Sequence, residues 1–220
     1  NGDDTDNSLY NSGAAHVFVR TKDTWTRQAF LKASKPDIVD YFGNSVSISG
    51  DTIAVGAYLQ DGGARGINGA PEDLSCQASG AVYVFTRSGD EWSQQAYIKA
   101  AYTNIVDNFG KAVALDDNTL VVGAVQERSG ATGVNGDVTD RSVFNAGAAY
   151  VFVRSGDEWT QQAYLKASNP GIEDEFGSAV AVRGDWIVIG AQNEDSAASG
   201  IDGNGEDNSG DYCGAAYVFH

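Results

Sequence analysis

The sequence predicts an all-β protein built from β-propeller blades, each with four antiparallel strands. The first observation is a strict repeat, in which residues 40–57 return as 107–124 and again as 174–191. The second is that no segment shows the 3.6-residue apolar periodicity of a helix. The third is that each unit holds short β-branched and aromatic segments separated by turns. Repeated four-stranded units of roughly 40 to 70 residues are typical of propellers.

The period is 67 residues, the step from Phe42 to Phe109 and from Phe109 to Phe176. A β-solenoid is the competing interpretation, but its rungs are much shorter than this unit and have a sub-period that is absent here. We therefore treat residues 1–220 as a single β-propeller region, with units at about 1–67, 68–134 and 135–201 and a partial unit at 202–220.

The strands of a unit differ in composition. Residues 14–20 and 25–33 predict two strands joined by a tight turn, and the Lys and Arg of the second are typical of an outermost strand, where they discourage outward pairing. Residues 42–49 alternate large and small residues, as in an innermost strand where sheets converge. Residues 53–57 are apolar on both faces and fit the centre of a sheet. A long polar loop, 58–79, then leads to the third strand of that unit.

In chain order, these strand assignments predict four units. The first has only its third and outermost strands, the next two are complete, and the last lacks its outermost strand. Propellers close with about four to eight blades, so three units do not complete a ring. We therefore expect the region to be part of a larger propeller or to associate with other copies of itself. The first residue, Asn1, is not Met, which indicates that the numbering begins inside a longer or processed chain.

The composition of the chain disfavours several classes of partner and site. The net charge is −16, from 30 acidic and 14 basic residues, and it disfavours nucleic acid and anionic membranes as partners. No apolar run is long enough to cross a membrane, and no signal-peptide pattern is present. Cys76 and Cys213 occupy non-equivalent repeat positions and form no zinc motif. They could pair with each other, pair with a cysteine elsewhere, or stay free.

Three motifs together resemble a known family. Phe42-Gly43, Gly56-Ala57 and the Gly-Ala-Val-Tyr-Val-Phe run at 80–85 are similar to the FG-GAP repeat of integrin α-subunit propellers and of their bacterial relatives, over nearly the whole chain. The resemblance implies a propeller, often seven-bladed, that is extracellular or at the cell surface and serves adhesion or ligand binding. Integrin-type repeats often bind calcium in the hairpin between the first two strands. That hairpin is too short here, so those sites are not carried over.

Candidate calcium ligands lie instead in the long loops. An Asn-Gly or Asp-Gly pair recurs in step, with an Asp five residues after its first member, and Ca²⁺ takes six to eight such oxygens. The alternative is a solvated loop whose Asx turns satisfy their own backbone, and both interpretations stay open. The candidate ligands are Asp61, Asn68, Asp73, Asn135, Asp137, Asp140, Asp195, Asp202, Asn204 and Asp207, with Glu72, Glu127, Glu194 and Glu206 nearby.

A second acidic series stands two residues before each Phe-Gly pair, at Asp40, Asp107 and Asp174. We expect these carboxylates to accept hydrogen bonds from the backbone amides of the preceding turn. A catalytic role is disfavoured because a residue repeated in every unit serves a need of every unit.

A tryptophan series, Trp25, Trp92 and Trp159, heads each outermost strand. The series could bind sugars, but its identical repeat position favours packing in the core or between blades. Trp186 stands where the other copies have Thr and is not explained by the repeat. We expect it at the surface.

The sequence offers few candidate catalytic residues. His16 takes the repeat position of a tyrosine and His220 is terminal, so no Ser-His-Asp arrangement is available. We therefore expect a non-enzymatic extracellular repeat protein for adhesion, ligand binding or assembly, calcium-associated, with a protein or glycan ligand at the cell surface or matrix. The alternative is a carbohydrate-active or other hydrolytic propeller that uses loop carboxylates.

Overall fold

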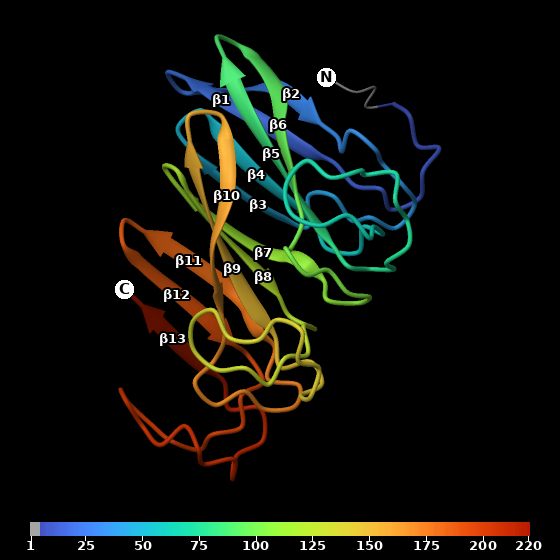
Figure 1. The fold of residues 1–220 in the computed structure, drawn as a ribbon. Coiled ribbons are helices and arrows are strands. Elements are labelled where there is room, and N and C mark those ends of the chain that lie inside the picture. Colours follow the sequence, from blue (N-terminus) through green and yellow to red (C-terminus); the bar gives the residue numbers. More distant parts are fainter. Residues whose placement is uncertain (1–4) are drawn as a thin grey trace.

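The computed structural model describes residues 5–220, in which every regular element is a β-strand (Figure 1). The strands form four antiparallel sheets, which we call the first to fourth blades in chain order. The blades are β1 (Ala15–Thr21) and β2 (Thr24–Leu31); β3 (Ser45–Ser49), β4 (Thr52–Ala57), β5 (Ala81–Ser88) and β6 (Glu91–Ile98); β7 (Phe109–Asp116), β8 (Thr119–Ala124), β9 (Ala148–Ser155) and β10 (Glu158–Leu165); and β11 (Phe176–Arg183), β12 (Trp186–Ala191) and β13 (Ala215–Phe219).

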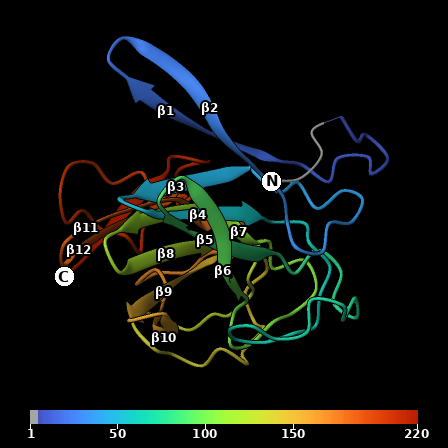
Figure 2. The ribbon, with the colours of Figure 1, turned by 90° about the horizontal axis from the view of Figure 1, so that it is seen from above.

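This arrangement confirms the predicted fold class and strand sequence, including the missing outermost strand of the fourth blade. Within a blade the strands follow one another in space as they do in the chain. Predicted boundaries differ by a few residues at the innermost strand, since β3 begins at Ser45 whereas β7 and β11 begin at the Phe of the Phe-Gly pair. Figure 2 shows the hairpin β1–β2 standing apart from the sheet that contains β10.

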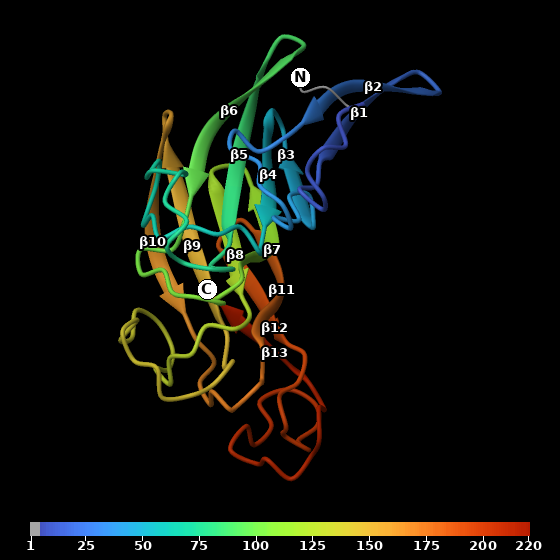
Figure 3. The same cartoon turned by 90° about the vertical axis from the view of Figure 1, so that its right-hand side faces the viewer.

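Antiparallel order places the connections at two ends. The tight hairpins all lie at one end of the strands, and the three long loops, 58–80, 125–147 and 192–214, lie at the opposite end (Figure 1). The innermost strands β3, β7 and β11 follow one another along one side of the molecule, with β6 and β10 on the other (Figure 3). The loop end therefore gathers equivalent segments from successive blades.

The Phe of each Phe-Gly pair fills the core of its own blade. Phe42 packs edge-on against Tyr83 at 5.4 Å and against Phe85 at 6.1 Å between ring centroids. The next two blades repeat this cluster with nearly the same distances and angles. Edge-to-face packing contributes about 1 kcal/mol of stability beyond that from the apolar area that such rings bury.

The two motif glycines let neighbouring blades approach closely. Gly110 has a positive φ of 90°, and a Cβ there would lie 2.5 Å from the carbonyl oxygen of Ala81 in the preceding blade. A Cβ at Gly123 would lie 2.0 Å from the carbonyl oxygen of Gly177 in the following blade. Both distances are too short for a side chain, so the repeat needs glycine at these places.

Trp92 and Trp159 pack against the preceding blade, as their repeat position predicted. The indole N–H of Trp159 donates to Oε1 of Gln95 in the preceding blade at 2.9 Å, and Trp159 is only 4% exposed. Trp25 occupies the same position in the first blade, which has no blade before it among the described residues, and is 63% exposed. Trp186 is 55% exposed and contacts the His220 ring, which confirms its surface position.

Trp159 and Trp25 share one repeat position, but their replacement by Ala should change the free energy of unfolding by different amounts. Trp159→Ala should lower the free energy of unfolding by about 3 kcal/mol or more, because it empties a buried interface between blades. Trp25→Ala should change it by less than about 1 kcal/mol. Urea unfolding followed by circular dichroism measures both values. Equal losses in the two variants would contradict the packing between blades.

Candidate functional site

Each long loop of the complete blades folds back along its own outermost strand. Asn68 donates its backbone N–H to the carbonyl of Tyr97 at 2.7 Å and accepts the Tyr97 N–H on its Oδ1 at 3.0 Å. Asn135 and Tyr164 make the same pair in the third blade, at 2.7 and 2.9 Å. Both asparagines have a positive φ, which Asn tolerates better than most residues. The recurring Asn-Gly pair thus fixes the loop to the strand.

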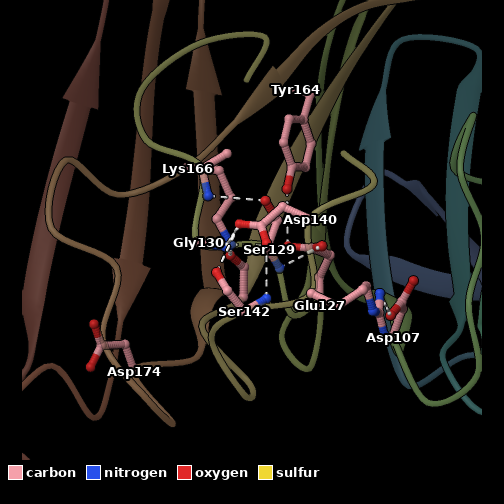
Figure 4. A network of polar contacts seen from close by, with 12 residues as sticks. Asp107, Glu127, Ser129, Gly130, Asp140, Ser142, Tyr164, Lys166 and Asp174 are labelled. Carbon is pink, nitrogen blue, oxygen red and sulfur yellow. Dashed lines mark hydrogen bonds and ion pairs between the residues drawn. The ribbon is translucent and has the colours of Figure 1, made fainter. Parts of the chain in front are cut away.

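A buried polar network lies beneath the loop of the third blade (Figure 4). The Nζ of Lys166 lies 2.9 Å from Oε2 of Glu127, and the Tyr164 hydroxyl donates to the same oxygen at 3.0 Å. The other oxygen of Glu127 accepts the backbone N–H of Ser129 at 2.9 Å. Burial lowers the pKa of Lys166, and the Glu127 carboxylate opposes that shift. Glu127 therefore connects the loop to the end of β10.

The second blade carries the same network without a carboxylate. Gln60 replaces the glutamate and accepts hydrogen bonds on Oε1 from the Tyr97 hydroxyl at 3.0 Å and from Lys99 Nζ at 3.2 Å. Lys99 also donates to Oγ of Ser79 at 2.6 Å. Burial lowers the pKa of Lys99 to about 7, because no carboxylate is in contact with its ammonium group to hold the proton.

These lysines correct one expectation from the sequence. The prediction that basic residues of the outermost strand discourage outward pairing is wrong for Lys99 and Lys166, which are fully buried. Each follows directly after its strand and turns inward toward the loop residue at position 60 or 127. The signal in the sequence is the recurring Tyr-x-Lys at 97–99 and 164–166 together with a Gln or Glu three residues after the central Gly-Ala.

The aspartates before Phe-Gly cap their turns, as predicted. The Oδ2 atoms of Asp40, Asp107 and Asp174 accept the backbone N–H of the residue three positions earlier, at 2.7, 3.0 and 2.6 Å. Burial raises the pKa of Asp40 to about 6. Asp107 also pairs with Arg141 at 3.2 Å. Figure 4 shows Asp107 and Asp174 on either side of the Lys166 network, so the series does not converge on one site.

The loop residues proposed as calcium ligands mostly accept hydrogen bonds from nearby backbone amides. Asp140 accepts the N–H of Gly130 at 2.8 Å and of Ser142 at 3.0 Å. The other aspartate and asparagine candidates that accept backbone N–H groups are Asp61 from Ala78, Asn68 from Tyr97, Asp73 from Ser75, Asn135 from Tyr164, Asp137 from Thr139, Asp195 from Tyr212, Asn204 from Glu206 and Asp207 from Ser209. Among residues 5–220 no three His, Cys, Asp or Glu side chains gather at metal-ligand spacing. This geometry matches the self-capped loop, and calcium binding stays a prediction.

Both cysteines are free thiols in the structure. Cys76 is half-buried in the loop of the second blade, whereas Cys213 is exposed next to β13. In the part of the chain that the structure covers, no helix could span a membrane.

Comparison with known families gives one match. The FG-GAP repeat matches three times, at residues 25–85, 92–152 and 159–219. Each match runs from the outermost strand of one blade through the third strand of the next. The matched segments therefore include the Phe-Gly contact between successive blades. A search of curated protein sequences finds no significant match to this chain.

The buried Lys99 predicts a specific pH dependence. Folded Lys99 loses its proton near pH 7, whereas an unfolded lysine keeps it to pH 10.5, so the unfolded state binds more protons between these values. The free energy of unfolding should therefore rise by about 1 kcal/mol per pH unit from about pH 7 to 8.5. The raised pKa values of Cys76 and the buried tyrosines oppose this trend at higher pH.

Two variants test whether Lys99 causes this increase in the free energy of unfolding with pH. Gln60→Glu should flatten it, since a carboxylate beside Lys99 raises the lysine pKa as Glu127 does for Lys166. Lys99→Met should remove the part of the slope that Lys99 contributes. Denaturant unfolding at several pH values measures all three proteins, and an unchanged slope in both variants would assign the effect to another group.

Calcium binding is tested through stability. Most of the capping carboxylates use one oxygen and leave the other for a cation, as Asp137 does with Thr139 on its Oδ1. A cation that binds only the folded chain should raise the melting temperature with free Ca²⁺, by mass action. Calorimetry with Ca²⁺, with Mg²⁺ as a control, and with a chelator measures the effect. Melting curves that coincide in all three conditions would refute calcium binding.

Proposed function

Since this chain belongs to the FG-GAP repeat family, we propose that it is a non-enzymatic extracellular domain that binds a protein ligand through its loop end. FG-GAP repeat proteins typically bind protein ligands, and their domains are typically extracellular. The proposal extends both properties to this chain. It includes calcium association of the loops, through carboxylate oxygens that the turns leave available.

The main support for the proposal is the acidic surface at the loop end, where hydrogen bonds hold the loops in place. The three long loops follow one another along that end of the sheets (Figure 1). Those of the second and third blades are paired to their outermost strands through Asn68 and Asn135, so they are held in place before any ligand arrives. A preorganised surface loses little conformational entropy on binding. Exposed acids such as Glu72, Glu206 and Asp211 favour a basic partner.

The positions of the histidines support a non-enzymatic role. His16 lies in β1 against Phe18 and Phe30, and His220 stacks on Trp186. The alternative of glycoside hydrolysis needs two carboxylates that face a common space. Glu127, the buried loop acid of the third blade, is instead engaged by Lys166 and Tyr164.

The experiment uses an array of fifteen-residue peptides that are basic, neutral or acidic at constant length, probed with the labelled 220-residue chain. We expect retention of a subset of basic peptides with a sequence preference. The loop variant Glu72→Gln/Glu206→Gln/Asp211→Asn should lose this retention. The matched control is the hairpin-end variant Asp23→Asn/Asp90→Asn/Asp157→Asn, which should keep it.

Both variants change the net charge from −16 to −13, because each removes three acidic groups. Equal losses in the two variants would show an effect of total charge and contradict binding at the loop end. Indifference to peptide charge would contradict it as well. Hydrolysis of an oligosaccharide panel by the wild-type chain would contradict the non-enzymatic assignment.

A further inference from the structure

The third blade departs from the repeat at one position in its long loop. In the second and fourth blades an aspartate accepts the backbone N–H of the residue 17 positions later, as Asp61 does from Ala78 at 2.7 Å and Asp195 from Tyr212 at 2.9 Å. The equivalent residues of the third blade are Arg128 and Asn145. An arginine side chain has no hydrogen-bond acceptor, so it cannot cap this turn.

The backbone of the turn keeps its shape although the capping residue has changed. The φ of Asn145 is 51°, against 49° at Ala78 and 53° at Tyr212. The carbonyl of Asn145 accepts the N–H of Glu175 at 3.2 Å, and the second blade has the same bond at the same distance. Within residues 5–220, however, no oxygen accepts the Asn145 N–H. The turn is thus formed, but its capping acceptor is missing from the described residues.

The Arg128 side chain lies beside this uncapped turn. Its Cζ is 4.6 Å from the ring centroid of Phe144, the residue before Asn145. Nε of Arg128 and Oδ1 of Asn145 are both buried, and neither has a hydrogen-bond partner in the described part of the chain. Most buried polar groups in folded proteins are paired, because an unpaired one lowers stability. We call Arg128, Phe144 and Asn145 together the Arg128 site.

The positive charge of Arg128 also has no partner. Arg141 is paired with Asp107 at 3.2 Å and Lys166 with Glu127 at 2.9 Å, whereas among the described residues no ion pair includes Arg128. The long loop of the third blade has three acids and two arginines, that of the second has three acids and one arginine, and that of the fourth has six acids and no basic residue. An anion therefore meets less repulsion at this loop than at the other two.

We propose that the Arg128 site binds a carboxylate group of a ligand. The carboxylate takes the place that an aspartate side chain has in the second and fourth blades. One of its oxygens accepts the Asn145 N–H, and the guanidinium group of Arg128 donates from Nε and from a terminal nitrogen. A half turn of the Asn145 amide exchanges Oδ1 for Nδ2, so that this side chain donates as well.

The site is open to solvent and belongs to a complete blade. Arg128 is half-buried and Phe144 is 45% exposed, so a ligand can reach the guanidinium group. The third blade has all four strands, and a described blade lies on each side of it. Carboxylate binding here goes beyond the proposed binding of a basic protein, and either can hold without the other.

The test follows the Asn145 amide of the nitrogen-15-labelled chain by nuclear magnetic resonance. Sodium acetate, sodium chloride and acetamide are added separately, at equal concentrations in a low-salt buffer. We expect a saturable downfield shift of the Asn145 amide proton with acetate, and binding at least about ten times tighter than that of chloride, because a carboxylate can accept two charge-assisted hydrogen bonds. An equal response to chloride or to acetamide would overturn the proposal.

A blocked tripeptide, N-acetyl-Ala-Asp-Ala-amide, distinguishes the two sources of a carboxylate. Tighter binding of this peptide than of acetate would identify a peptide side chain as the ligand group. Equal or weaker binding would identify a small organic acid, and both results agree with the proposal. The same peptide with Asn in place of Asp is the neutral control and should cause no shift. No saturable shift of Asn145 with either carboxylate would overturn the proposal.

Variants at Arg128 locate the contact. Arg128→Asp restores the residue of the neighbouring blades, so it should cap Asn145 from within the chain and abolish the response to acetate. Arg128→Gln should weaken acetate binding at least about tenfold, because it removes the charged donors. The control is Arg65→Gln in the loop of the second blade, where Arg65 lies over the Tyr102 ring at 4.6 Å. It should bind acetate as the wild type does. An undiminished response in the Arg128 variants, or an equal loss in Arg65→Gln, would overturn the assignment.

Discussion

The structure depends on the close approach of backbones between successive blades. A Cβ at Gly110 would lie 2.5 Å from a carbonyl oxygen of the preceding blade, and a Cβ at Gly123 would lie 2.0 Å from a carbonyl oxygen of the following blade. The neighbouring Phe109 fills the core of its own blade against Tyr150 and Phe152. The Phe-Gly and Gly-Ala pairs are therefore one contact seen from its two sides. Any side chain at these glycines would separate the sheets.

Because each blade contacts only its neighbours, equivalent residues differ by what lies next to them. Trp159 is buried against Gln95, whereas Trp25 is exposed. Glu127 pairs with Lys166, whereas Glu194 accepts a hydrogen bond from the amide of Asn169. The same array places the long loops at one end of the sheets (Figure 1). The loop end, the surface to which we assign ligand binding, thus follows from one repeated contact.

Much of this fold could be predicted because a 67-residue period records every strand several times. The capping role of Asp40 and the packing of Trp159 followed from the same logic, since repeated residues serve repeated needs. The inward turn of Lys99 could not be predicted, because strand periodicity does not say which way a residue just beyond the strand points. The pairing of Asn68 with Tyr97 was also not predicted, because an Asn-Gly pair is equally typical of a metal ligand, of a turn and of a contact between a loop and a strand.

The most direct test of this account compares one substitution at two equivalent glycines. Gly123→Ala places a methyl group against the next blade, whereas at Gly190, in the fourth blade, the nearest atom to a Cβ is 3.5 Å away. Denaturant unfolding should show Gly123→Ala less stable by about 2 kcal/mol or more and Gly190→Ala within about 0.5 kcal/mol of the wild type. Equal effects at both positions would contradict the claim that close contact between blades determines the fold.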